Sequence, residues 1–155
     1  MEGMVSNCSE AIKAARDFRC WIRCRHPSSK AAVMTRTRSS ARAAGQRFER
    51  LIADHLREEL SNEFIDIRPK NGRNDRGDIG GVRHHGHAIV LECKDFGGRM
   101  LPGTWVEEAE VERGNDDALA GVVVIKRKGT TDPGSQYVLM TVDDLTALLT
   151  LERPR

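Results

Sequence analysis

The first clear pattern of hydrophobic and polar positions begins after Ser40. Phe48, Leu51, Ile52 and Leu56 recur at intervals of three or four residues, and charged residues fill most of the positions around them. Because an α-helix turns once in about 3.6 residues, this spacing gathers the apolar side chains on one face. The pattern predicts a helix of about five turns with its charged side chains directed to solvent.

Short apolar segments bounded by Gly, Pro and Asp residues follow this helix. Such segments indicate strands, whereas longer stretches with spaced apolar residues indicate helices. The predicted strands are residues 63–67, 78–83, 87–94, 121–127 and 135–142, and the predicted helices are residues 103–119 and 143–151, the last capped by Asp143 or Asp144. The order α, β, β, β, α, β, β, α predicts an α/β fold in which helices flank a mixed central sheet.

A His-rich connection joins two of the predicted strands. Residues 78–83 and 87–94 flank the sequence His-His-Gly, and Gly86 suits the left-handed position of a three-residue hairpin loop. We therefore expect Arg83 to pair with His87. This pairing fixes which residues of the two strands face each other.

In that register Asp78 faces Glu92. Glu92 and Lys94 project to the same side of the sheet, because side chains alternate along a strand. The residues before them, Ala88 to Leu91, are apolar on both faces of the strand. The sequence thus predicts two carboxylates and an ammonium meeting on one face of the sheet, at the end of an apolar strand.

These charged side chains need partners, because isolated charges in an apolar setting cost several kcal/mol. A hard cation such as Mg²⁺ prefers oxygen ligands and keeps several waters, so two carboxylates and one backbone carbonyl suffice as protein ligands. Bound Mg²⁺ can polarise a phosphodiester oxygen and lower the pKa of a water, while Lys94 holds that water or neutralises developing charge. The predicted chemistry is hydrolysis of a phosphodiester.

Asp78, followed after thirteen residues by Glu92-Cys93-Lys94, resembles the signature of the PD-(D/E)XK nucleases. The order from "GQRFERLIADHL" through "GDIGG", "AIVLECK" and "GVVVIKRKG" is similar to the archaeal-type Holliday junction resolvases and their phage relatives. The resemblance spans roughly residues 43–150. It implies a restriction-endonuclease-like fold and a Mg²⁺-dependent endonuclease for branched DNA, with Mn²⁺ as a possible substitute for Mg²⁺.

The resemblance also implies roles for individual residues. Asp78 and Glu92 would be metal ligands, Cys93 would lend its backbone carbonyl, and Lys94 would orient the attacking water. Glu49, on the first predicted helix, matches the upstream acid that supplements the metal site in this superfamily. The alternative is a structural role. Glu92 and Lys94 would then form an ordinary ion pair at a strand end, and Glu49 would occupy a solvated helix position.

Two positions depart from the family's pattern. Gly77 replaces the Pro before the first acid, and the preceding loop offers Asn71 and Asn74 where some resolvases have a functional Ser or Thr. Basic residues in this loop and after the strand of residues 121–127 are predicted to contact DNA phosphates. They are Arg68, Lys70, Arg73, Arg76, Lys126, Arg127 and Lys128.

Charge is divided unevenly along the chain. The overall net charge is +2, but residues 1–42 carry about +6 and the remainder about −4. We expect residues 1–39 to form a basic, flexible arm that favours a polyanion partner, followed by one domain over residues 40–155. Met34 also resembles an initiation point.

The cysteines and the hydropathy indicate where the chain works. We find neither a signal peptide nor an apolar run near the ~20 residues needed to cross a membrane, so we expect a cytoplasmic protein in a bacterial or phage-infected host, without membrane contact. A zinc site would draw on Cys8, Cys20, Cys24 and His26, but their spacing is unlike that of a usual zinc knuckle.

Other candidate residues have simpler interpretations. His84, His85 and His87 lie in a turn and are expected to face solvent. Trp105 and Tyr137 are isolated aromatic residues, and we expect them to pack rather than to stack on bases.

The favoured hypothesis is a homodimeric, Mg²⁺-dependent Holliday junction resolvase, since two symmetric cuts call for two active sites. The alternatives are a repair or restriction-type nuclease that acts on duplexes or flaps, and a non-catalytic DNA-binding module of the same fold.

Overall fold

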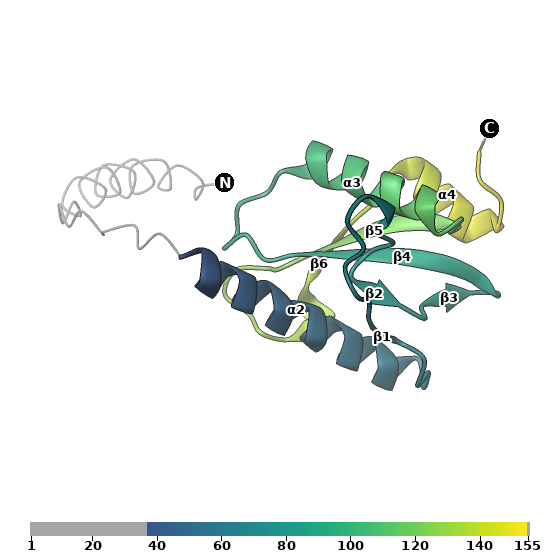
Figure 1. The fold of residues 1–155 in the computed structure, drawn as a ribbon. Helices are drawn as coiled ribbons and strands as arrows, with labels where there is room; N and C mark the ends of the chain where they lie inside the picture. The colour runs from purple at the N-terminus through teal and green to yellow at the C-terminus, as the bar shows by residue number, and fades with distance from the viewer. Residues whose placement is uncertain (1–36, 155) are drawn as a thin grey trace, which may run out of the picture. The chain divides into compact units, whose positions relative to one another are not determined.

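The structure is a computed structural model that describes residues 37 to 154 (Figure 1). The predicted basic arm lies almost entirely outside the described residues. The same is true of the four zinc-ligand candidates, Cys8, Cys20, Cys24 and His26.

A mixed six-stranded sheet forms the centre of the described residues. β4 and β5 are parallel, the other pairs are antiparallel, and the order across the sheet is β1-β2-β4-β5-β6, with β3 paired to β4 alone. The strands are β1 (Asp66–Ile67), β2 (Ile79–Gly80), β3 (Arg83–His84), β4 (His87–Lys94), β5 (Ala120–Ile125) and β6 (Tyr137–Leu139). The predicted α/β fold with a mixed sheet is confirmed.

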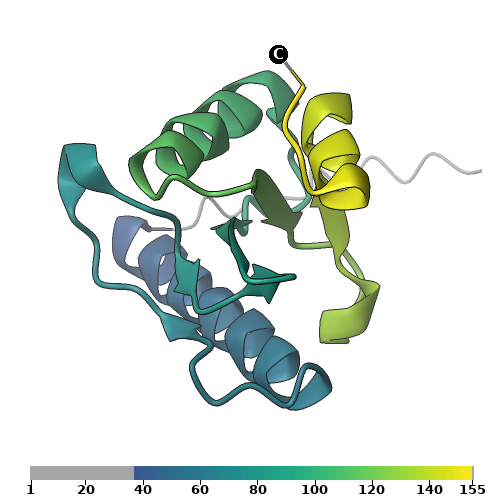
Figure 2. The same ribbon diagram turned by 90° about the vertical axis from the view of Figure 1, so that its right-hand side faces the viewer.

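Three helices cover the sheet: α2 (Arg38–Glu59), α3 (Pro102–Asn115) and α4 (Val142–Thr150). α2 lies against one face, and α3 and α4 lie against the other (Figure 2). Helix α2 is the amphipathic helix that the apolar spacing predicts, and its buried face includes Phe48 and Ile52. None of the helices between residues 37 and 154 is long and apolar enough to cross a bilayer.

The sheet separates two hydrophobic clusters. On the α2 side, Phe48 and Ile52 contact a cluster that includes Leu91, Cys93 and Val124. On the α3 side, Trp105 and Ala109 pack against Val123, Ile125 and Leu139. Because β5 is covered on both faces, all its residues are buried, which explains its continuous apolar sequence.

The hairpin differs from the prediction by one residue. His84, rather than Arg83, faces His87. The connection is therefore a two-residue turn of His85 and Gly86, with φ values of 48° and 88°. Positive φ at both central positions is the geometry that matches the twist of paired strands, and His tolerates it better than most residues.

A bulge compensates for that difference. The predicted strand over residues 78–83 is interrupted at Gly81, and beyond the interruption Ile79 pairs with Leu91. Gly81 has a φ of 81°, and a Cβ there would lie 2.1 Å from a backbone oxygen, so only Gly fits. The extra residue restores the predicted register at Ile79, and Asp78 lies directly beyond this last pair of β2 with β4.

Helix α4 begins differently from the prediction. Its N-cap is Thr141, not Asp143 or Asp144, and Asp144 completes a capping box with Thr141. The buried Asp144 carboxylate also accepts hydrogen bonds from the Gly121 N–H at 3.2 Å and from Arg153 at 2.7 Å. It therefore fastens α4 and the chain beyond it to β5.

Replacing Asp144 is expected to destabilise the domain. In Asp144→Ala, the Gly121 amide and the Arg153 guanidinium lose their acceptor, which should lower the free energy of unfolding by roughly 2–4 kcal/mol. The matched control, Asp143→Ala, changes an exposed acid in the same turn and should cost less than about 1 kcal/mol. Urea unfolding followed by circular dichroism measures both, and equal losses would contradict this account of α4.

Candidate active site

The sequence-predicted acids come from three elements and are all buried. Glu49 lies on α2, Asp78 directly precedes β2, and Glu92 lies near the end of β4. Their exposed fractions are 7%, 4% and 8%. Asp78 interacts electrostatically with both of the other carboxylates, so the structure brings the three acids together.

Asp78 is held by hydrogen bonds on every side. Its Oδ2 accepts from the backbone N–H of Cys93 at 2.8 Å, and its Oδ1 accepts from Lys70 Nζ at 2.7 Å. Its own N–H donates to the Leu91 carbonyl at 2.8 Å. These contacts fix the carboxylate against β4, directly beyond the end of the β2 ladder at Ile79.

Glu92 and Lys94 form the second part of the site. They share one face of β4, as the alternation of side chains predicts, and Lys94 Nζ lies 2.7 Å from Glu92 Oε1. The same ammonium lies 2.6 Å from Glu108 Oε2 on α3. Burial lowers the pKa of Lys94, but the bonds to Glu108 and Glu92 outweigh it and raise the pKa overall. Lys94 is therefore held in its charged form.

The carboxylates of Glu92 and Glu49 are both difficult to ionise. Burial, together with the charge of Asp78, raises the pKa of Glu92 to about 8 despite the opposing effect of Lys94. Burial and Asp78 also raise the pKa of Glu49, and Lys70 opposes them. The negative charge at this edge of the sheet exceeds what the nearby ammoniums compensate.

Sequence reasoning missed Glu112 on α3. This side chain lies against Glu92, and its Oε2 is buried without a hydrogen-bond partner among the described residues. Two carboxylates can approach so closely only when they share a proton or a cation, and burial is the largest cause that raises the pKa of Glu112. The available signal was the i, i+4 spacing of Glu108 and Glu112, which places both acids on one helix face.

Lys70 lies beside two of the acids. Its ammonium is 2.7 Å from Asp78 and 3.8 Å from Glu49, and its predicted contact with DNA remains a prediction. It thus places a positive charge between two acids of the site. Within residues 37–154, no three His, Cys, Asp or Glu side chains gather into a ready-made metal site.

Cys93 contributes through its backbone. Its N–H donates to Asp78, while its buried thiol belongs to the apolar cluster beneath α2. Burial is the largest cause that raises the pKa of this thiol, so it stays protonated and unreactive. The metal-binding role predicted for its carbonyl remains a prediction.

The other basic residues divide into two groups. Arg68 binds Asp116 at 2.8 Å, and Arg76 lies 3.7 Å from the same acid, so both anchor the loop before β2. Arg73 lies exposed in the short helix Gly72–Asn74 of that loop. The second group, Lys126 to Lys128, directly follows β5.

The histidines of the hairpin are separate from this site. His85 and His87 are exposed and His84 is partly exposed, as predicted for a solvent-facing turn. Trp105 is buried, as expected of a packing residue, whereas Tyr137 is 49% exposed and packs only in part.

The contact between Glu92 and Glu112 generates a stability prediction. Because both folded-state pKa values are raised, the contribution of this pair is full below the ordinary pKa of 4.5 and is lost as pH rises through the raised values, which for Glu92 is about 8. In metal-free buffer, Glu112→Gln should therefore raise the free energy of unfolding by about 1 kcal/mol near pH 9, and by less near pH 5.

The matched control is Glu107→Gln, an exposed position on the same helix, which should change stability by under about 0.5 kcal/mol. Chemical denaturation at the two pH values measures both variants. A destabilised Glu112→Gln protein, or a gain that does not depend on pH, would contradict the crowding of these carboxylates.

No protein-family model matches the chain, and neither a curated protein nor a solved structure matches it.

Proposed function

We propose that the chain is a metal-dependent DNA endonuclease of restriction-endonuclease-like fold that hydrolyses phosphodiester bonds. The observation that carries the proposal is the group of three buried acids, Glu49, Asp78 and Glu92. Asp78 interacts electrostatically with both of the others, and Lys94 bonds Glu92 at 2.7 Å. Buried like charges reduce stability, so their presence calls for a purpose other than folding.

The donor set fits a hard divalent cation. Asp78 and Glu92 would hold Mg²⁺, with Glu49 and the Cys93 carbonyl as further ligands, because carboxylate and carbonyl oxygens are what this ion prefers. The buried Glu112 Oε2, which lacks a partner among the described residues, is a further oxygen that a cation would satisfy. When bound, Mg²⁺ or Mn²⁺ supplies charge stabilisation for phosphodiester hydrolysis.

Lys94 acts as a donor in this proposal. The raised pKa keeps its ammonium charged, so it can hold a water or neutralise charge on a phosphate oxygen but cannot accept a proton. Glu92 and Glu108 fix its position from two elements. Preorganised donors of this kind need no rearrangement during the reaction.

Branched DNA is the proposed substrate, and a homodimer is the proposed assembly. Both come from the resemblance to Holliday junction resolvases, in which paired cuts need paired sites. Lys126, Arg127 and Lys128 follow the strand next to β4 and would contact phosphates near the cut. We propose a cytoplasmic location for the same activity.

A non-catalytic DNA-binding module is the second candidate. It is favoured by the ion pairs that already join Lys70 to Asp78 and Lys94 to Glu92, since such pairs compensate part of the buried charge without a metal. In that case the acids would position the lysines, and DNA would bind without turnover.

A cleavage assay separates these candidates. The purified protein with Mg²⁺ is offered a labelled four-way junction, the matching linear duplex and a flap. Paired symmetric nicks in the junction alone indicate a resolvase, and cleavage of every substrate indicates a general nuclease. Binding without cleavage indicates the module.

Asp78→Asn and Glu92→Gln should each lower the cleavage rate by at least about 100-fold while DNA binding persists, because the ligands are lost but the phosphate contacts remain. The control Glu107→Gln should cleave like the native protein. Full activity in either ligand variant would refute the assignment of the site.

A further inference from the structure

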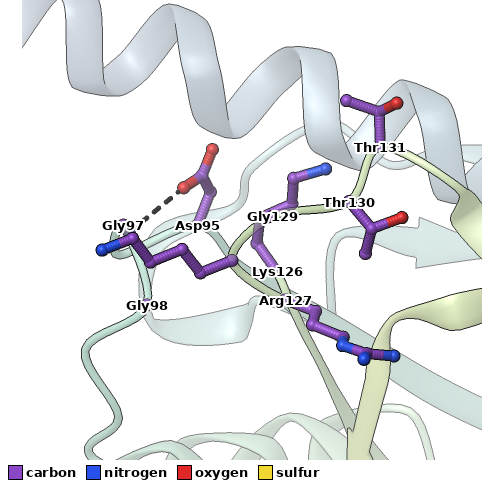
Figure 3. Close-up of a pocket in the computed structure, with 9 residues that line it drawn as sticks. Asp95, Gly97, Gly98, Lys126, Arg127, Gly129, Thr130 and Thr131 are labelled. Atoms are coloured by element: carbon purple, nitrogen blue, oxygen red, sulfur yellow. Dashed lines mark hydrogen bonds between the residues drawn. The ribbon is translucent and has the colours of Figure 1, made fainter.

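A second cluster of functional groups lies outside the carboxylate site. The loop of residues 126–131 faces the turn that contains Gly97 and Gly98, and together they line an open pocket of about 470 Å³ (Figure 3). The two segments leave the sheet side by side, since the Lys126 N–H donates to the Lys94 carbonyl at 2.9 Å. Open α/β sheets characteristically bind ligands beyond the carboxyl ends of their strands.

The pocket carries an excess of positive charge. Lys126, Arg127 and Lys128 line it together with one acid, Asp95. Within the described part of the chain, none of these three cations forms a salt bridge. Charge-assisted hydrogen bonds from such groups are the usual means of binding an anion.

Aromatic rings support two of the cations without neutralising them. Lys126 Nζ lies 5.4 Å from the centre of the Phe48 ring, and the Arg127 guanidinium lies 5.5 Å from the centre of the Tyr137 ring. Cation–π contacts restrict these side chains while their positive charge remains for a ligand. The arrangement is thus more ordered than a row of surface lysines.

Glycines determine the walls of the pocket. Gly98 has a φ of 90°, and a Cβ there would lie 3.3 Å from the Lys128 Cβ, so the turn and the basic loop approach closely. At Gly97 and Gly129 the added Cβ would meet open space. Glycine at such positions lets a ligand approach the backbone.

The basic residues also line an adjoining pocket of about 210 Å³. Its other walls include Met100 and Tyr137, which supply apolar surface. The half-exposed Tyr137 ring, unexplained by core packing, therefore lies next to the same cations. Cations next to an apolar aromatic surface suit a nucleotide within a strand, because the cations bind its phosphate and the ring contacts its base.

We propose that this loop and turn form a subsite for a backbone phosphate that lies near the scissile phosphate on the same nucleic-acid strand, with the neighbouring nucleoside against Tyr137. The proposal rests on the proposed function, because it takes DNA as the ligand and names where its strand runs. The shared chemistry is a phosphate group, which can belong to an internal linkage or to a strand end.

The test measures binding rather than cleavage. Anisotropy titrations use the full chain, without divalent cations, and labelled DNA in which one internal phosphate at a time is replaced by a neutral methylphosphonate. Two further DNA substrates of the same sequence differ only in whether a terminal phosphate is present. The variants are Lys128→Gln and Lys128→Arg, with Arg83→Gln on the distant hairpin as the matched loss of one charge, and circular dichroism verifies that each is folded.

One neutral linkage should weaken binding to the native protein by about tenfold, as expected for one charge-assisted contact. Lys128→Gln should bind unmodified DNA correspondingly more weakly, and neutralising that linkage should no longer weaken its binding. The slope of the logarithm of the binding constant against the logarithm of salt concentration should fall in magnitude by about 1. Lys128→Arg and Arg83→Gln should retain the sensitivity.

If Lys128→Gln removes the sensitivity at an internal linkage, Lys128 and that phosphate are coupled and the subsite binds within a strand. If Lys128→Gln is coupled in this way only to the terminal phosphate, the subsite binds a strand end. If the effects of Lys128→Gln and of every substitution in the DNA simply add, the subsite is refuted. Cleavage without coupling refutes the subsite alone, whereas coupling without cleavage in Mg²⁺ refutes the nuclease alone.

Discussion

The hydrogen bond from the Cys93 backbone to the Asp78 carboxylate is the contact on which both the sheet and the candidate site depend. The β2 ladder ends at Ile79, and beyond it the Asp78 side chain takes the place of a backbone acceptor at 2.8 Å from the Cys93 nitrogen. A buried amide is thereby satisfied by a charge, which must itself be compensated. Lys70 provides that compensation at 2.7 Å.

Compensation is incomplete once the neighbouring acids are included. Lys94 contacts Glu92 and Glu108, but Glu92 still has a pKa raised to about 8, and the buried oxygen of Glu112 has no partner among the described residues. Apolar side chains of similar volume would be at least as stable in these positions. The excess of acids is therefore easier to understand as preparation for a cation or a proton than as part of the folding energetics.

The sequence was sufficient for the elements that bury an unbroken apolar face. The spacing of Phe48 and Ile52 predicted α2, and the apolar sequence of residues 121–127 predicted a strand where β5 lies. The register next to Asp78, with Ile79 opposite Leu91, is also as predicted, but for an incomplete reason. The hairpin loop is one residue shorter than predicted, and the bulge at Gly81 adds that residue back.

The acids of α3 could not be predicted in the same way. Only Trp105 and Ala109 of that helix are buried, so the sequence gives little indication of which face meets the sheet, and a Glu on the inner face contradicts the usual pattern. The position of Lys70 likewise depends on how the loop before β2 folds back. Arg68 and Asp116, which are far apart in sequence, determine that path through their ion pair.

The parallel pairing of β4 and β5 connects the two proposed sites. Glu92 and Lys94 lie at the end of β4, and β5 leads directly into the basic loop. The Lys126 N–H donates a hydrogen bond to the Lys94 carbonyl. The backbone separation between the two sites is thus fixed by sheet hydrogen bonds rather than by loops. Because a nucleic-acid strand carries its phosphates at regular intervals, a fixed separation would let contact at one site position the strand at the other.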